Sequence, residues 1–305
     1  LRDRNQALSQ PQRVFLSELP DLLAAERVAG QIVDGGKDFG LFTMSGSPDD
    51  IAPFPMVVVG NQTFAELHRG LAAGQRVRVE VNASNTLGRD TLVQWNTVGE
   101  IRGSDRPDEV VLLGAHLDSW DVSTGATDNA SGSIAVLEAA RILGALKARG
   151  IRPRRTIRFA LFSGEEQGLY GSQYYTLRHR LELPRHQAVL VLDNGTGRIV
   201  ALPLQGQEHL RDVWTEMMRP FASNPLGPIA VRSGVKTGTD HLAFQPANVP
   251  AFNYDQLKRG YDYTHHSQVD VFSYAAPEDV MQAAIVMAVN ALQLANLDRL
   301  LPRTR

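Results

Sequence analysis

Three strand-like runs of mostly apolar residues, each followed by residues with helical spacing, constrain the fold of this chain more than any other feature. The runs are VVLLGA at 110–115, TIRFALF at 156–162 and AVLVL at 188–192. Strands of parallel sheets are buried on both faces, so they lack the alternation of half-exposed strands. Apolar spacing predicts helices over 131–148, 170–180, 207–218 and 277–300, with shorter strands near 229–231 and 251–254. The alternation predicts an α/β fold with a mostly parallel or mixed central sheet and helices on both faces.

The first part of the chain has a different pattern. A helix is expected over 14–29 and another over 63–72, and short strand-like runs lie at 30–33, 56–59 and 77–81. This pattern predicts a small α/β module, which we bound at residues 1–94. The larger α/β domain then covers residues 95–305.

Composition excludes several classes of function. The 305 residues include no cysteine, so disulfides, thiolate metal sites and a cysteine nucleophile are excluded. A net charge of −2 does not indicate nucleic-acid binding, and the one basic run, at 147–158, is expected to be a solvated connection between a helix and a strand. No run of about 18 apolar residues is present, so no membrane span is expected. Any metal must be bound by His, Asp and Glu, a set that suits zinc or a similar divalent metal.

Side chains of the kind that bind metals follow each of the three apolar runs. His116 and Asp118 follow the first run, Glu165 and Glu166 the second, and Asp193 the third. In open α/β sheets, ligands bind outside the carboxyl ends of the strands.

Two further candidates lie in loops. Asp128 directly precedes an expected helix, and His265 and His266 lie far downstream. Taken singly, Asp128 is as readily a helix cap, Asp193 a turn residue, and the two pairs ordinary surface groups. Together these residues predict a metal site at one edge of the sheet.

The segments that carry these residues resemble one family. GAHLDSWD (114–121), GATDNASG (125–132), SGEEQGLYGS (163–172), LDNGTG (192–197), GTDHLAF (238–244) and YTHHSQVD (263–270) are similar to the M28 metallopeptidases, with greatest likeness to the carboxypeptidase Q branch. The resemblance covers residues 95–305. The segment 54–81 more loosely resembles the closing strand–helix–strand of a protease-associated domain, so residues 1–94 are expected to be part of such a module.

The resemblance implies a site for two zinc ions per chain. His116 and Asp193 would hold one ion, Glu166 and His266 the other, and Asp128 would bridge both. His266 is chosen over His265 because the family places an Asp four residues after the ligand, which here is Asp270. His265 then occupies a position that is often Tyr in the family.

The resemblance also implies two catalytic roles. Glu165 would be the general base that takes a proton from a water held between the metals and passes it to the leaving amine. Asp118 would orient His116 by accepting its other ring N–H. The segment with Asp240 and His241 is expected to form scaffold for the pocket.

The resulting prediction is a zinc-dependent exopeptidase that acts on peptides or dipeptides as an aminopeptidase, a dipeptidase or a carboxypeptidase. Alternatives are a glutaminyl cyclase-like acyltransferase with one zinc, a non-catalytic receptor-like relative, and another two-metal hydrolase. The resemblance implies a secreted or periplasmic protein and a possible homodimer. Because the chain starts at Leu1 and not at Met, and opens with a polar stretch, we expect that the true N-terminus is missing and any targeting signal with it.

Overall fold

The computed structural model describes residues 9–46, 53–84, 86, 88 and 91–303. The chain divides into two compact units, Leu1–Asp90 and Thr91–Arg305. All of the predicted site residues belong to the second unit.

The smaller unit pairs two short parallel strands with two helices. Its elements are α1 (Gln10–Ala25), β1 (Gln31–Asp34), β2 (Met56–Val59) and α2 (Asn61–Ala72). Helix α1 begins before the predicted residue 14, and the backbone N–H of its N-cap residue Ser9 donates to Gln12 Oε1 at 2.9 Å. The likeness of this unit to a protease-associated domain stays a prediction.

The predicted strand at 77–81 is wrong. Residues 75–84 form no regular strand, and Val79 and Val81 are about half exposed. Alternation of valine with charged residues fits a strand only when a neighbouring strand takes up its hydrogen bonds and one face is buried. Within the described residues of this unit, β1 and β2 pair only with each other.

The larger unit is built on a five-stranded sheet, which confirms the predicted fold class. Its strand order is β3–β5–β4–β6–β9, where β4, β5, β6 and β9 are parallel and β3 is antiparallel to β5. The bounds are β3 (Thr97–Ile101), β4 (Arg106–His116), β5 (Arg155–Phe162), β6 (His186–Val191) and β9 (Ala251–Asn253).

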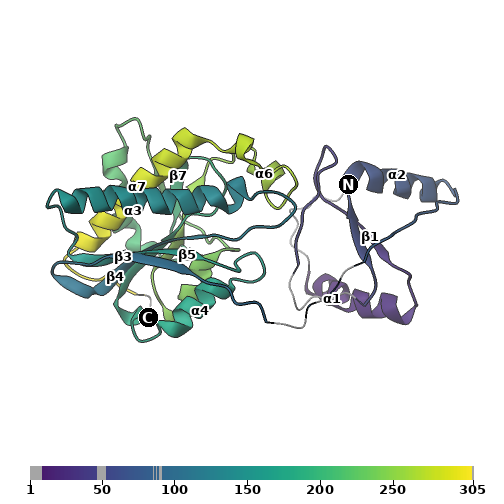
Figure 1. Cartoon of the computed structure of the whole chain (residues 1–305), viewed down its shortest axis with the longest axis horizontal. Coiled ribbons are helices and arrows are strands. Elements are labelled where there is room, and N and C mark those ends of the chain that lie inside the picture. The colour runs from purple at the N-terminus through teal and green to yellow at the C-terminus, as the bar shows by residue number, and fades with distance from the viewer. Residues whose placement is uncertain (1–8, 47–52, 85, 87, 89–90, 304–305) are drawn as a thin grey trace. The chain divides into compact units, whose positions relative to one another are not determined.

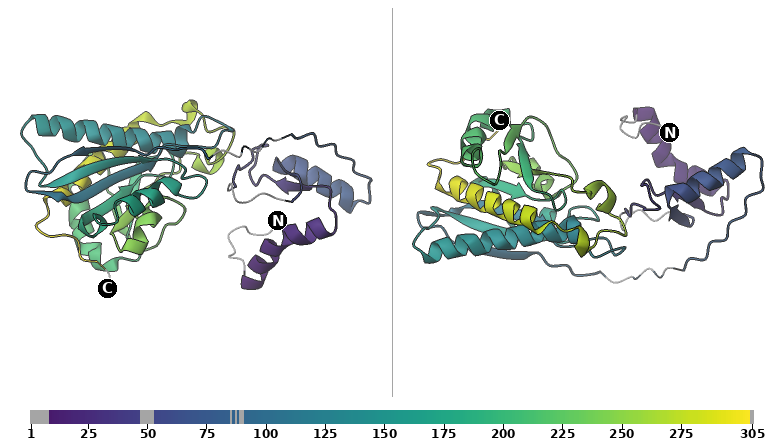
Figure 2. Two further views of the ribbon diagram at one scale, coloured as in Figure 1. Left: turned by 60° about the horizontal axis from the view of Figure 1, so that its bottom comes forward. Right: turned by 90° about the horizontal axis from the view of Figure 1, so that it is seen from above.

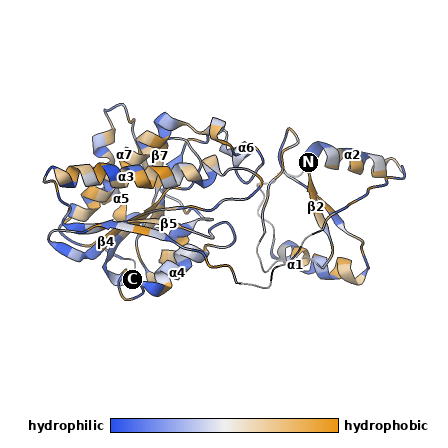
Figure 3. Ribbon diagram, in the orientation of Figure 1, coloured by the Kyte–Doolittle hydropathy of each residue, from blue (hydrophilic) through white to orange (hydrophobic). Residues whose placement is uncertain are grey.

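Helices cover both faces of this sheet because successive side chains of its strands point to opposite faces. Val111 and Leu113 of β4 pack with α3 and α7, while Leu112 packs on the other face with α4 and η5. The bounds are α3 (Ser131–Ala148), α4 (Tyr170–Arg178), η5 (Asp240–Ala247) and α7 (Pro277–Asn296). Figure 1 shows α3 and α7 on one side of the strands and α4 on the other. In Figure 3 the central strands are largely hydrophobic, whereas the helices carry both kinds of residue.

A second, three-stranded sheet flanks the first. It has the order β10–β7–β8, with β7 (Ile199–Pro203), β8 (Ala230–Arg232) and β10 (Asp255–Gln256). Helix α5 (Arg211–Met218) contributes Trp214, whose ring lies edge-on to Phe252 of β9 at 5.0 Å between centroids. Figure 2 shows this part of the larger unit from two further sides. Within the described part of the chain, no helix has the length and apolar character needed to cross a bilayer.

The parallel register brings the strand ends to one edge. His116 of β4 is the register partner of Phe162 in β5, and Gly114 of β4 is the partner of Val191 in β6. The loops that follow these strands therefore leave the sheet side by side, at its carboxyl edge. This edge carries the predicted metal site.

Candidate metal centre

Three of the predicted ligands meet at the ends of β4 and β6. The Nε2 of His116 lies 3.2 Å from Asp193 Oδ1 and 3.3 Å from Asp128 Oδ1. His116 and Asp128 are almost completely buried. One ligand atom from each of the three residues lies within 4.8 Å of the others, close enough to surround one cation.

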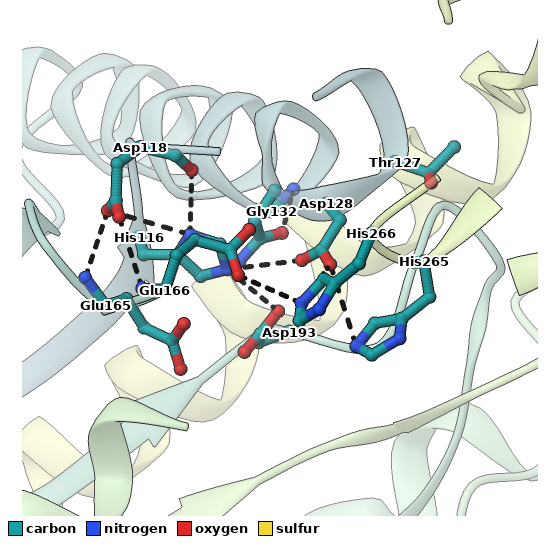
Figure 4. Close-up of polar contacts among 12 residues, drawn as sticks. His116, Asp118, Thr127, Asp128, Gly132, Glu165, Glu166, Asp193, His265 and His266 are labelled. Carbon is teal, nitrogen blue, oxygen red and sulfur yellow. Dashed lines mark hydrogen bonds and ion pairs between the residues drawn. The ribbon is translucent and has the colours of Figure 1, made fainter. Parts of the chain in front are cut away.

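The other two predicted ligands approach Asp128 from its second oxygen. The Nε2 of His266 lies 2.9 Å from Glu166 Oε2 and 3.4 Å from Asp128 Oδ2. Figure 4 shows Asp128 between His116 on one side and His266 on the other. The structure thus brings all five residues together, with Asp128 shared between two groups.

His265 lies beside this second group. Its ring stacks on His266 with 3.7 Å between centroids, and its Nε2 is 3.8 Å from Asp128 Oδ2. Asp128, His265 and His266 also form a set whose ligand atoms lie within 4.8 Å of one another. His266 has a φ of 55°, a left-handed conformation that is uncommon for a residue with a side chain and is concentrated at functional sites.

Asp270 holds the loop that presents Asp128. Its carboxylate accepts the backbone N–H groups of Thr127 at 2.6 Å and Asp128 at 3.0 Å. The hydroxyl groups of Thr127 and Thr264 are 2.7 Å apart, with Thr264 at the end of α6 (Tyr261–Thr264). In the sequence, Asp270 served only to distinguish His266 from His265 by spacing, so this contact was not predicted.

Gly132 allows the first turn of α3 to approach the end of β6. A Cβ atom at this position would lie 2.2 Å from Asn129 Oδ1 and 2.4 Å from the carbonyl oxygen of Leu192. Asn129 uses its side chain to accept the Gly132 N–H and to donate to Leu192. The close approach brings Asp128 and Asp193 to the same place.

Asp118 contacts His116 through its backbone, and its predicted role stays a prediction. The Nδ1 of His116 lies 2.9 Å from the carbonyl oxygen of Asp118 but 3.8 Å from its carboxylate. The carboxylate instead accepts the backbone N–H groups of Glu165 and Glu166, both at 3.2 Å (Figure 4). The backbone of Asp118 therefore orients the imidazole, while its side chain holds the two glutamates.

A cavity of about 460 Å³ opens beside the cluster. Its floor and walls are formed by Asp128, Glu165, Glu166, Gly168, Leu169, Asp193, Asn194, Thr237, Gly238, Tyr261, His265 and His266. Such a volume is typical of sites for small ligands.

Crowded carboxylates perturb the protonation of this site. Burial and then the charge of Asp193 raise the pKa of Glu165 to about 10. Burial also raises the pKa of Glu166, and the charge of Asp128 adds to it against the hydrogen bond from His266. Burial alone would lower the pKa of His116, but Asp193 and Asp128 raise it well above its ordinary value. These shifts are those of buried negative charges that lack sufficient compensation.

Two further residues lie near the cluster: the half-buried Tyr261, which the sequence did not single out, and Asp240, which it placed only in the scaffold of the pocket. Tyr261 lines the cavity, and burial followed by the charge of Asp128 raises its pKa well above the usual range. Asp240, at the start of η5, is fully buried, and burial raises its pKa to about 7. No local pattern in the sequence marks Tyr261, which is brought to the cavity by the short helix α6.

A mixed sheet with helices on both faces, and a cluster of imidazole and carboxylate groups at the strand ends, define an α/β domain of the metallopeptidase type. The family model described as "Peptidase family M28" matches residues 96–290. The chain belongs to peptidase family M28.

Curated relatives and solved structures agree with this family. The chain is 34% identical over 257 residues to carboxypeptidase Q of Mus musculus, covering 84% of this chain and 53% of that protein. It therefore spans about half the length of the curated relatives it matches.

Among solved structures, a peptidase M28 precursor from Shewanella amazonensis SB2B matches with a TM-score of 0.78 and 26% identity over 97% of this chain and 67% of that one. A zinc aminopeptidase from Bacillus subtilis shares the fold, with a TM-score of 0.54 and 24% identity over 65% of this chain and 49% of that one.

Proposed function

We propose that the larger unit is the catalytic domain of an exopeptidase that uses two zinc ions. The observation that carries this proposal is the position of Asp128. Its Oδ1 lies 3.3 Å from the Nε2 of His116, and its Oδ2 lies 3.4 Å from the Nε2 of His266. A carboxylate between two imidazoles is the arrangement that a bridging ligand requires.

The residues fit two cations of this kind. His116 and Asp193 would hold one zinc, Glu166 and His266 the other, and Asp128 both. Nitrogen and oxygen donors of this type suit zinc. The Oε1 of Glu166 is buried and accepts no hydrogen bond within the described chain, although a buried carboxylate oxygen normally has a partner. When bound, zinc polarises a carbonyl group and lowers the pKa of water.

Glu165 is the proposed general base. It lies on the wall of the cavity, next to the ligand Glu166 but outside the close contacts among the five ligands. Its pKa of about 10 keeps it protonated at neutral pH when cations are lacking. Positive charge beside Asp193 and Glu166 would oppose that shift and let Glu165 accept a proton from water and deliver it to the leaving amine.

The relatives and neighbours support an exopeptidase, since their names include a carboxypeptidase and a zinc aminopeptidase. The cavity of about 460 Å³ has a volume typical of small-ligand sites, which suits the end of a peptide. A homodimer and a location outside the cytoplasm stay predictions of the sequence.

Glu165→Gln tests the proposal. The variant should keep two zinc equivalents and lose about 10²- to 10⁴-fold in kcat, because glutamine has similar shape but cannot accept the proton. Glu138→Gln, on the outer surface of α3 where it pairs with Arg141, is the matched control and should retain activity. Metal content by mass spectrometry and hydrolysis of a dipeptide panel are measured together.

Three results would count against the mechanism. Near-normal turnover of Glu165→Gln would remove Glu165 from the chemistry. One zinc equivalent in the wild type would favour a single-zinc enzyme such as a glutaminyl cyclase-like acyltransferase. Absence of hydrolysis in a fully zinc-loaded wild type would refute a peptidase.

A further inference from the structure

A lysine that the proposed chemistry does not use lies just behind one wall of the cavity. Thr237 and Gly238 line the cavity, and Lys236 precedes them. Its Nζ donates to the Oδ1 of Asn194 at 3.2 Å, and Asn194 also lines the cavity. The ammonium group is therefore one side chain away from the space that a substrate would fill.

Lys236 is held firmly in this position. Its ammonium pairs with Asp255 of β10, and its backbone N–H donates to Gln205 Oε1 at 2.8 Å. Asn194 is held too, since its Nδ2 donates to the carbonyl oxygen of Tyr254 at 2.9 Å. A lysine fixed by several contacts loses less side-chain entropy when it binds a ligand than a freely moving one.

The charge balance favours a negative ligand on this wall. Arg232 Nη1 also lies 3.8 Å from Asp255, so one carboxylate faces two cationic groups and a positive charge is left over. The described residues that line the cavity include four carboxylates and neither lysine nor arginine. Two divalent cations would neutralise those four carboxylates, and the surplus positive charge beside Asn194 would then dominate.

We propose that Lys236, positioned by Asn194, binds the free α-carboxylate of the substrate. This inference rests on the proposed exopeptidase function and deepens it, because it assigns a subsite that selects peptides with an unblocked carboxyl end. The Asn194 hydrogen bond and the Asp255 ion pair use two of the three N–H donors of the ammonium. Among the described residues the third donor has no further partner, so it is available for the substrate carboxylate.

The test compares two substrates that differ only at the carboxyl end. The substrates are alanyl-alanine and alanyl-alanine amide. Their rates of hydrolysis are measured with the zinc-loaded wild type and with the variants Lys236→Met, Lys236→Arg and Lys147→Met. Lys147 is an exposed lysine in the last turn of α3, so its variant controls for the loss of one positive charge elsewhere. Zinc content reports that each variant is folded at the site.

The wild type should prefer the acid over the amide in kcat/KM, and Lys236→Met should lower that preference about 10- to 100-fold, as expected for a hydrogen bond between charged groups. Lys236→Arg should restore most of the preference, and Lys147→Met should keep it. Equal rates for acid and amide in the wild type, or an unchanged preference in Lys236→Met, would overturn the carboxylate subsite.

A binding measurement separates this inference from the proposed function. Calorimetry with a dipeptide whose peptide bond is reduced to CH₂–NH compares the acid and its amide without hydrolysis. If no substrate is cleaved, the peptidase proposal fails. Tighter binding of the acid that is lost in Lys236→Met would still support the subsite, and equal binding of both would refute it.

Discussion

Replacing Asp270 by alanine should weaken both the fold and the metal site. Asp270 is 2% exposed, and its carboxylate accepts two buried backbone N–H groups, from Thr127 and Asp128. The backbone carbonyl of Asp270, which accepts the N–H of Thr124, remains in the variant. The substitution therefore removes the side-chain contacts alone.

The size of the effect follows from these two contacts. A buried N–H group that loses its acceptor costs about 1–3 kcal/mol, so two such groups cost about 2–6 kcal/mol. Burial, together with the charge of Asp128, raises the pKa of Asp270, so the ionised side chain is itself under strain and part of the loss is offset. We expect the metal-free protein to lose an amount near the lower end of this range.

Bound zinc should increase the loss in the free energy of unfolding that Asp270→Ala causes. A cation on Asp128 removes the repulsion between Asp128 and Asp270, so the wild type gains more from Asp270 when it is loaded. The variant also has a less firmly held bridging carboxylate, so its zinc affinity should fall about 10-fold or more, as when groups that orient ligands are removed from metal sites.

Urea unfolding, followed by tryptophan fluorescence, measures the free energy with and without zinc, and a chromophoric chelator measures affinity by competition. Trp214 is fully buried in the larger unit and reports its unfolding. Asp212→Ala, an exposed aspartate in the first turn of α5, is the control and should change the stability by less than about 1 kcal/mol. If Asp270→Ala matches this control in both stability and zinc affinity, the reasoning about the loop is refuted.

Three further predictions concern packing, metal binding and pH. Gly132→Ala should destabilise the protein by about 1–3 kcal/mol, because the new Cβ would lie 2.2 Å from the nearest atom. The control Gly144→Ala lies in the same helix with nothing within 4 Å of its Cβ, so it should stabilise the protein by about 0.5–1 kcal/mol; thermal unfolding measures both. His266→Ala should lose one zinc equivalent while His265→Ala keeps both; the reverse result would exchange their roles. In chelator the free energy of unfolding should fall from pH 7 to 9, since the folded chain retains a proton on Glu165, whose pKa is about 10, and the unfolded chain does not. A flat profile would contradict that pKa, and zinc should reduce the slope.

The central sheet could be predicted because the sequences of its inner strands are apolar enough to require burial on both faces. A run such as VVLLGA would expose apolar side chains to water if it lay at the surface. The helices that follow these strands in the sequence connect them as a parallel sheet. Strand β3 was not predicted because it lies at an edge, where Ile101 alone is buried and Val98 is 46% exposed. The run at 77–81 shows the converse, because its alternation suits a strand but the described fold provides no partner.

Candidate ligands could be predicted since strand ends place them, but their supporting contacts could not. The carboxylate of Asp118 binds the amides of Glu165 and Glu166 because the two loops lie side by side, and spacing alone does not show which group it faces. Asp270 and Lys236 act through loops whose conformations depend on the finished fold. Local sequence therefore indicates which side chains can bind metal, and tertiary structure decides which other residues hold those side chains in position.

The long separation between His116 and Asp270 has a consequence for how the enzyme comes into being. As the ribosome makes the chain, strands β4, β5 and β6 emerge well before the segment that supplies His266 and Asp270. A nascent or clipped chain that ends before this segment would have most of its sheet yet lack one imidazole and the support for Asp128. Hydrolytic capacity would then require that the chain has been made at least as far as Asp270.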